Sequence, residues 1–224
     1  MTRHAGALLV ACCAVVLLQA CGNNPPAPDW KLNAHSALAR ATNAYLEGRT
    51  TIAEREFASA RAEIARTGRS DLMARAELMR CAARTASLAF EPCTAFDALR
   101  ADAPPAEIAY AAYLAGHSTA ADLPLLPPHH RQVATLGITE AAAVSALQSM
   151  PDALSRQIGA AVLLETGRAN PAVIALAIDN ASAQGWRRPL LAWLTLQAQR
   201  AQTAGDTAAA DAVRRRIALI ESGN

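Results

Sequence analysis

Alanine dominates this sequence and sets the strongest limit on its fold. It supplies about a quarter of the residues, whereas aromatic residues make up only 4% and β-branched residues are sparse. Alanine has the highest helix propensity of all residues, and Val, Ile and Thr are relatively poor helix formers. Few segments alternate apolar and polar residues with the period of two that a half-buried strand requires. The sequence therefore predicts an all-α protein.

Glycine and proline residues divide the chain into predicted helices. Most of these helices are separated by short turns, so that neighbours should be antiparallel and form a bundle or a solenoid of hairpins. Residues 117–128, which contain three prolines, are expected to be irregular. The predicted helices are 29–47, 51–67, 70–90, 94–100, 104–115, 129–136, 139–150, 151–166, 170–184, 189–204 and 207–221.

The distribution of apolar residues predicts the order of these helices in space. Residues 158–164 and 173–178 are apolar on nearly every side of their helices, so these two helices should lie between others. The first and the last hairpin carry more charge and are expected at the ends of the domain.

The first 28 residues have the pattern of an export signal followed by a tether. Arg3 and His4 precede an uncharged apolar run, Ala5 to Leu18, and residues 22–28 are polar and rich in proline. A basic start, a short apolar core and small residues at the cleavage site are typical of a secretory signal peptide. We expect a signal peptide over residues 1–20, a tether over 21–28 and one helical domain over 29–224.

The end of this signal resembles a bacterial lipoprotein box. Leu18, Ala20 and Cys21 match it, and Gln19 departs from the usual small residue. The resemblance implies that Cys21 carries acyl chains such as palmitate and anchors the protein in a membrane. Gly22, in place of the Asp that retains family members at the inner membrane, implies the periplasmic face of the outer membrane.

Two alternatives to lipidation at Cys21 follow from the same segment. Leu9 to Cys12 also fits the letters of the box, but cleavage there leaves too short an apolar segment. An uncleaved anchor is the other alternative, although the apolar run is shorter than the roughly 20 residues of a spanning helix.

Cys81 and Cys93 are the two cysteines that remain after export and lipidation. In an oxidising compartment such a pair indicates a disulfide. Closing a loop of about a dozen residues should stabilise the fold by about 3 kcal/mol. The alternative is that both cysteines are small buried hydrophobes.

Residues 34–65 resemble a tetratricopeptide (TPR) repeat, a helical hairpin of about 34 residues. Ala53, Phe57 and Ala60 match the second helix of that family, and Gly48 stands at the turn. The family's Trp and Leu of the first helix and its final Pro are missing. A weaker match near the C-terminus rests on Trp193 and Leu196 and on alanines in the last helix.

The TPR resemblance implies a TPR-like solenoid or superhelical bundle and a binding groove lined by the first helix of each hairpin. The alternative for Leu38 and Tyr45 is that they are simply core residues. The groove residues that the resemblance implies are His35, Leu38, Thr42, Tyr45, Thr195, Gln199 and Gln202.

No motif for catalysis, cofactor or metal binding is found, and the charge gives no sign of nucleic-acid binding. Lys and Arg number 21 against 19 Asp and Glu. The chain lacks a nucleophile elbow, a phosphate-binding glycine loop and a His-Glu-x-x-His motif. His129 and His130 are adjacent, so a helix points them about 100° apart.

These patterns together predict a lipid-anchored periplasmic scaffold that binds another envelope protein or peptide. Proteins with a similar layout of lipid and repeats assist outer-membrane protein insertion or the assembly of pili and secretins. The alternative is an envelope enzyme with its site in the loop from His117 to His130.

Overall fold

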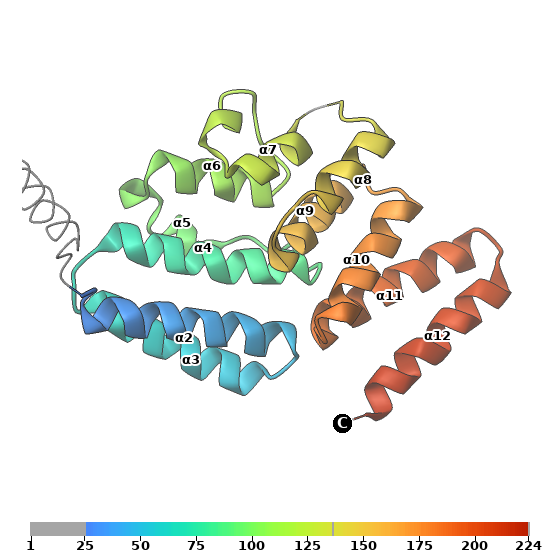
Figure 1. The fold of residues 1–224 in the computed structure, drawn as a ribbon, viewed down its shortest axis with the longest axis horizontal. Helices are drawn as coiled ribbons and strands as arrows, with labels where there is room; N and C mark the ends of the chain where they lie inside the picture. The colour runs from blue at the N-terminus through green and yellow to red at the C-terminus, as the bar shows by residue number, and fades with distance from the viewer. Residues whose placement is uncertain (1–25, 136, 224) are drawn as a thin grey trace, which may run out of the picture.

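The computed structural model describes residues 26–135 and 137–223, and within these ranges the chain forms helices and no strand. The prediction of an all-α protein is therefore confirmed (Figure 1). The predicted signal peptide and Cys21 lie outside the described residues. The helices are α2 (Asp29–Leu46), α3 (Thr50–Ala65), α4 (Ser70–Ala86), α5 (Thr94–Asp97), η2 (Arg100–Asp102), α6 (Pro105–Leu114), η3 (Leu123–Leu125), α7 (Pro128–Ala134), α8 (Glu140–Gln148), α9 (Ala153–Glu165), α10 (Pro171–Ala183), α11 (Arg187–Thr203) and α12 (Thr207–Ser222).

Side-chain caps fix the starts of several helices. The side chains of Thr139 and Asn170 accept hydrogen bonds from the backbone of the first turns of α8 and α10. The prediction that Pro151 starts a helix is wrong, because Asp152 caps α9 by accepting from two backbone N–H groups. Likewise, Pro189 is not the first residue of α11, which begins at Arg187.

The end of α4 also differs from the prediction. The helix ends at Ala86 and not near residue 90, because Leu88 adopts a left-handed conformation with φ +60°. The backbone N–H groups of Leu88 and Ala89 donate to carbonyl groups of the last turn, which is how a glycine usually ends a helix. At the corresponding turn after α2, Gly48 takes φ +87° without a side-chain penalty.

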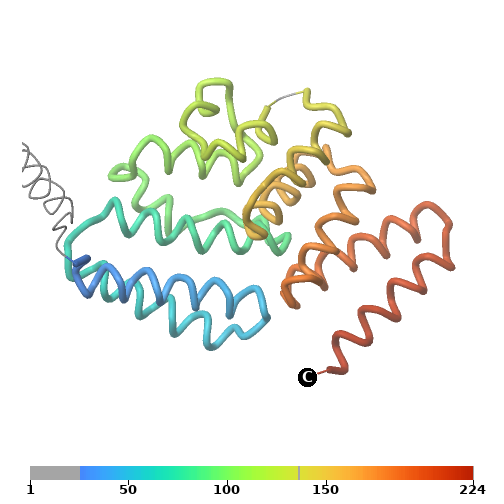
Figure 2. Tube along the Cα trace, in the orientation of Figure 1, coloured from blue at the N-terminus to red at the C-terminus, as the bar shows by residue number. Residues whose placement is uncertain are grey.

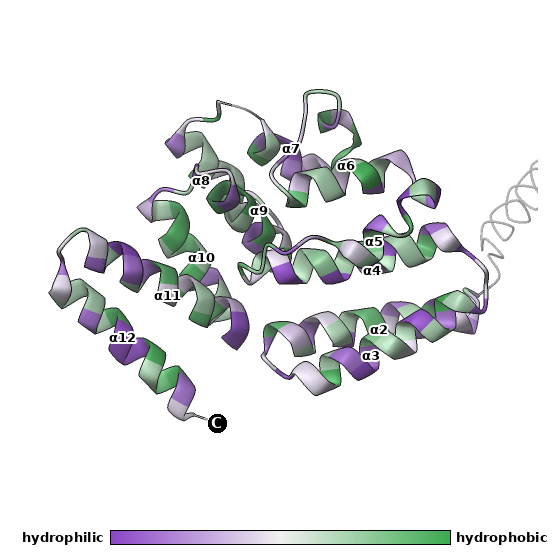
Figure 3. Cartoon of the chain, turned by 180° about the vertical axis from the view of Figure 1, so that it is seen from behind, coloured by the Kyte–Doolittle hydropathy of each residue, from purple (hydrophilic) through white to green (hydrophobic). Residues whose placement is uncertain are grey.

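The hairpins α2/α3 and α11/α12 lie at the periphery, and the helices from α4 to α10 form an arch that joins them (Figures 1 and 2). The two hairpins also meet, because α11 contacts α2. Both charged hairpins are peripheral, but they are not the separate ends that the sequence predicted, since they are in contact. Figure 3 shows more hydrophilic colouring on α3 and α12 than along α10. The apolar helix α9 contacts α4, α6, α7, α8 and α10, as predicted for a helix between others.

Long hairpins do not continue through the whole chain. Residues 88–139 pass through the short helices α5, α6 and α7 and through irregular segments. As a result, α4 packs against α9, which follows it only after this insertion.

The buried side chains form two clusters. The larger one occupies the centre and includes Trp193, Tyr113 and Phe96, all without exposed surface. The smaller one joins the α2/α3 hairpin to α4 and contains Ala34, Ala41, Phe57, Ile64 and Ala76. In the described part of the chain, no helix is both long enough and apolar enough to cross a bilayer.

Candidate binding groove

A groove with a volume of about 330 Å³ lies between the α2/α3 hairpin and α4. We call it the front groove. Small side chains, Ala41, Ala53 and Ala83, line it from three different helices and leave space that larger residues would fill. The full lining consists of Leu38, Ala41, Thr42, Tyr45, Thr50, Ala53, Glu54, Phe57, Met79, Arg80, Ala83, Arg84, Ala89, Glu91 and Arg188.

Three of the four groove residues predicted on the first helix do line the front groove. They are Leu38, Thr42 and Tyr45, and all three are half-buried. Leu38 also packs against the smaller core cluster and Tyr45 against the larger one. The core role considered for these two residues is therefore present together with the lining role. His35 is exposed on α2 and does not line the front groove.

The predicted groove residues of α11 lie elsewhere. Thr195 and Gln199 are exposed, and Gln202 accepts a hydrogen bond from Nη2 of Arg214 at 2.9 Å. That bond joins α11 to α12 within the last hairpin. The structure therefore does not bring these three residues to the front groove.

Arg188, at the start of α11, reaches the front groove from the far end of the sequence. Its Nε donates to the backbone oxygen of Tyr45 at 2.8 Å, and its Nη2 donates to Oγ1 of Thr50 at 2.7 Å. Its guanidinium also lies 4.3 Å from the centre of the Tyr45 ring. Burial raises the pKa of the Tyr45 hydroxyl, and the positive charge of Arg188 opposes that effect.

Sequence reasoning missed Arg188, because the predicted helix began at residue 189 and the signal depends on α11 beginning at Arg187. A cation in the first turn of a helix is disfavoured by the helix dipole. Arg187 and Arg188 both occupy that turn of α11, where their charge needs another explanation. For Arg188 the explanation is its contact with Tyr45 and Thr50.

Two arginines of α4 complete the rim of the front groove. The guanidinium of Arg80 lies over the ring of Phe57, 5.0 Å from its centre. Arg84 donates to Oε2 of Glu91 at 2.7 Å. Among the described residues Arg80 forms no ion pair, so its charge is available to a ligand.

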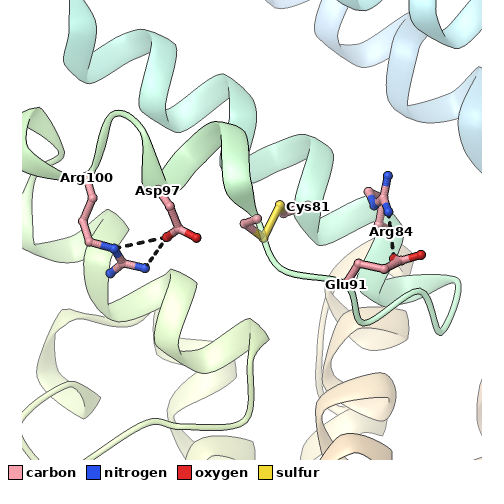
Figure 4. Close-up of a disulfide and its surroundings, with 6 residues drawn as sticks. Cys81, Arg84, Glu91, Asp97 and Arg100 are labelled. Carbon is pink, nitrogen blue, oxygen red and sulfur yellow. Dashed lines mark hydrogen bonds and ion pairs between the residues drawn. A yellow bond between two sulfur atoms is a disulfide. The ribbon is translucent and has the colours of Figure 1, made fainter.

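Residues 88–93, which we call the strap, run back along α4 and contribute Ala89 and Glu91 to the front groove. The Sγ atoms of Cys81 on α4 and Cys93 on the strap are 2.13 Å apart, which is bonding distance (Figure 4). The Arg84–Glu91 pair lies on one side of the two sulfur atoms and the Arg100–Asp97 pair on the other. A disulfide here ties one wall of the groove to α4.

In the segment from His117 to His130, the alternative enzyme site, His130 and Asp122 each interact with a different neighbouring residue. His130 is only 1% exposed, and its Nδ1 lies 3.0 Å from the hydroxyl of Tyr113. Burial, together with the nearby His129, lowers the pKa of His130 to about 3. Asp122 instead accepts hydrogen bonds from the backbone and side chain of Thr119.

The same segment shows no metal centre. Within residues 26–135 and 137–223, no three His, Cys, Asp or Glu side chains converge as ligands of one ion would. His130 is instead packed as a neutral core residue against two tyrosine rings, those of Tyr110 and Tyr113.

No protein-family profile, curated protein or solved structure matches this chain. The resemblances to a lipoprotein box and to a TPR repeat therefore rest on the residues that carry them.

Proposed function

We propose that this protein is a lipid-anchored helical scaffold of the cell envelope that binds a segment of another protein in the front groove. The observation that carries the proposal is the convergence of Leu38, Thr42 and Tyr45 with residues of α3, α4 and α11 around one groove. The TPR resemblance implies a binding role for the same three residues.

Packing of the first hairpin supports a TPR-like arrangement at this end of the molecule. Ala53 and Ala60 are buried, and α2 and α3 make the most extensive helix contact of the described chain. Phe57 is buried beside α4, in the gap between this hairpin and the next helix. Small residues where helices approach and an aromatic between neighbours are what the TPR pattern implies.

The chemistry of the front groove suits a polypeptide segment. Apolar and aromatic side chains provide area to bury, while Thr42, Arg80 and Glu54 supply polar groups at the surface. Binding sites commonly combine an apolar lining with a few polar groups that fix orientation. A volume of about 330 Å³ accommodates a few side chains of a partner.

The membrane anchor is proposed from the lipoprotein box. Several acyl chains on Cys21 would hold the protein firmly, since each buried CH₂ contributes about 0.8 kcal/mol. Cells grown with a radioactive fatty acid should yield labelled wild-type protein and unlabelled Cys21→Ala protein. Label that persists in the Cys21→Ala variant would contradict lipidation at this residue.

Affinity capture from chemically crosslinked envelopes tests the binding role. Wild-type protein should recover a specific envelope protein, and Arg80→Glu should recover much less of it because the charge at the groove is reversed. Arg55→Glu is the matched control, because Arg55 is exposed on α3 and does not line the groove. Equal recovery by all three proteins, or no specific recovery by the wild type, would contradict the proposal.

A further inference from the structure

A second groove lies on the other side of α4, between that helix, α6 and the η3 segment. Its volume is about 370 Å³, and we call it the side groove. Neither the TPR resemblance nor any motif pointed to it. It is lined by Arg75, Leu78, Met79, Ala106, Glu107, Tyr110, Leu125, Leu126 and Pro127.

The side groove brings together large apolar side chains that remain in contact with water. Met79 is 40% exposed and Leu125 is 44% exposed, and they come from elements far apart in the sequence, α4 and η3. Only five large apolar residues of the described chain are exposed to this degree. Single exposed apolar residues need no explanation, but their convergence in one depression is typical of an interaction site.

The side groove and the front groove meet at Met79, which lines both. Figure 1 shows why, since α4 runs between the α2/α3 hairpin and α6. The contacts of α4 with α2, α3 and α6 agree with this view. One ligand that crosses α4 at Met79 can therefore occupy both grooves.

The charges along this surface differ between the two grooves. In the side groove, Nε of Arg75 donates to Oε1 of Glu107 at 2.6 Å, so the only acid and the only base there are paired. In the front groove, Glu91 is paired with Arg84. Glu54 is then the one remaining acid of the lining, against the two positive charges of Arg80 and Arg188.

We infer that the partner segment is an acidic amphipathic peptide that crosses α4. Its apolar side chains occupy the side groove around Met79 and Leu125, and its carboxylates lie beside Arg80 and Arg188 in the front groove. The front groove carries an excess of positive charge and the side groove an exposed apolar surface. Together they determine the chemistry of the partner. The inference rests on the proposed function and specifies the partner of the same site.

Three synthetic peptides of equal length test this inference. The first combines Asp and Glu with Leu and Phe at helical spacing. The second has Lys in place of every acid, and the third has Ser in place of every apolar residue. Each carries a fluorophore, and anisotropy is measured with the full lipidated protein in nanodiscs of neutral phosphatidylcholine, with empty nanodiscs as the blank.

The acidic amphipathic peptide should bind at least about 10-fold more tightly than either of the other two. Burial of one apolar side chain is worth about that factor, and the Lys peptide places like charges beside Arg80 and Arg188. Its affinity should fall as salt is raised. Equal affinity for the acidic and the basic peptide would overturn the inference, and so would equal affinity for the acidic and the Ser-substituted peptide.

Variants assign the effect to the two grooves. Met79→Ser and Leu125→Ser should each weaken binding of the acidic peptide by about 10-fold. Leu32→Ser is the matched control, because Leu32 is 53% exposed on α2 and lines neither groove. All three side chains are exposed enough that the fold should persist, which circular dichroism checks.

The outcomes separate the two proposals. If capture from envelopes depends on Arg80 but Met79→Ser and Leu125→Ser bind the acidic peptide as the wild type does, then the side groove is not part of the site. If capture is independent of Arg80, the proposed function itself fails.

Discussion

The bond between Cys81 and Cys93 allows the most quantitative prediction. The two residues are separated by 12 positions and connect α4 with the strap. In the chain-entropy description, a cross-link that closes a loop of this size removes freedom from the unfolded chain and stabilises the folded state by about 3 kcal/mol. Replacing both residues in a Cys81→Ser, Cys93→Ser variant should lower the free energy of unfolding by that amount.

Urea denaturation followed by circular dichroism measures this loss. Wild-type protein in reductant should show the same loss, whereas the double variant should be insensitive to reductant. Two free thiols in denatured, unreduced wild-type protein would refute the disulfide. A free energy of unfolding that is the same with and without reductant would refute the entropic reasoning.

Three further predictions concern single structural features, all measured by urea denaturation. The pKa of His130 is about 3 in the folded protein against 6.5 in the unfolded chain. Below pH 6.5 the unfolded chain therefore takes up a proton that the folded protein does not. The free energy of unfolding should fall by about 2 kcal/mol between about pH 8 and pH 5. A His130→Phe, Tyr113→Phe variant should lose that part of the slope, and an unchanged slope would contradict the assignment. Phe57→Ala should lower the free energy of unfolding by about 3 to 5 kcal/mol, because it removes the ring that packs between the first hairpin and α4. A loss below about 1 kcal/mol would argue against that contact. Asn170→Ala should lower the free energy of unfolding by about 1 kcal/mol, because Oδ1 of Asn170 accepts a hydrogen bond from the backbone N–H of Val173 at 2.9 Å. An unchanged free energy of unfolding would mean that this cap is not formed.

Local sequence signals were sufficient to predict the helices but not all of their ends. Alanine content and glycine turns predicted the succession of helices. Pro151 and Pro189 were wrongly taken as helix starts, because proline is favoured in a first turn but does not require one. The end of α4 at Leu88 could not be predicted, since nothing marks a leucine as left-handed.

The front groove was predictable only in the part that comes from the first hairpin. Leu38, Thr42 and Tyr45 were identified because that hairpin follows a repeat pattern. Arg188 and the residues of α4 could not be assigned, because long-range packing brings them to the groove and no repeat pattern extends over residues 69–185. The exposed positions on α11 matched the pattern in sequence, but α11 reaches the groove only through its first turn.

The central claim is that a partner occupies the front groove, and site-specific photocrosslinking in living cells tests it most directly. A photoreactive phenylalanine analogue is placed at Thr42, which lines the groove, or at His35, which lies two turns earlier on the same helix and outside it. We predict a crosslinked protein from position 42 that is absent from position 35 and is lost when Arg80→Glu is added. No crosslink at position 42, or the same crosslinked protein from both positions, would contradict the claim.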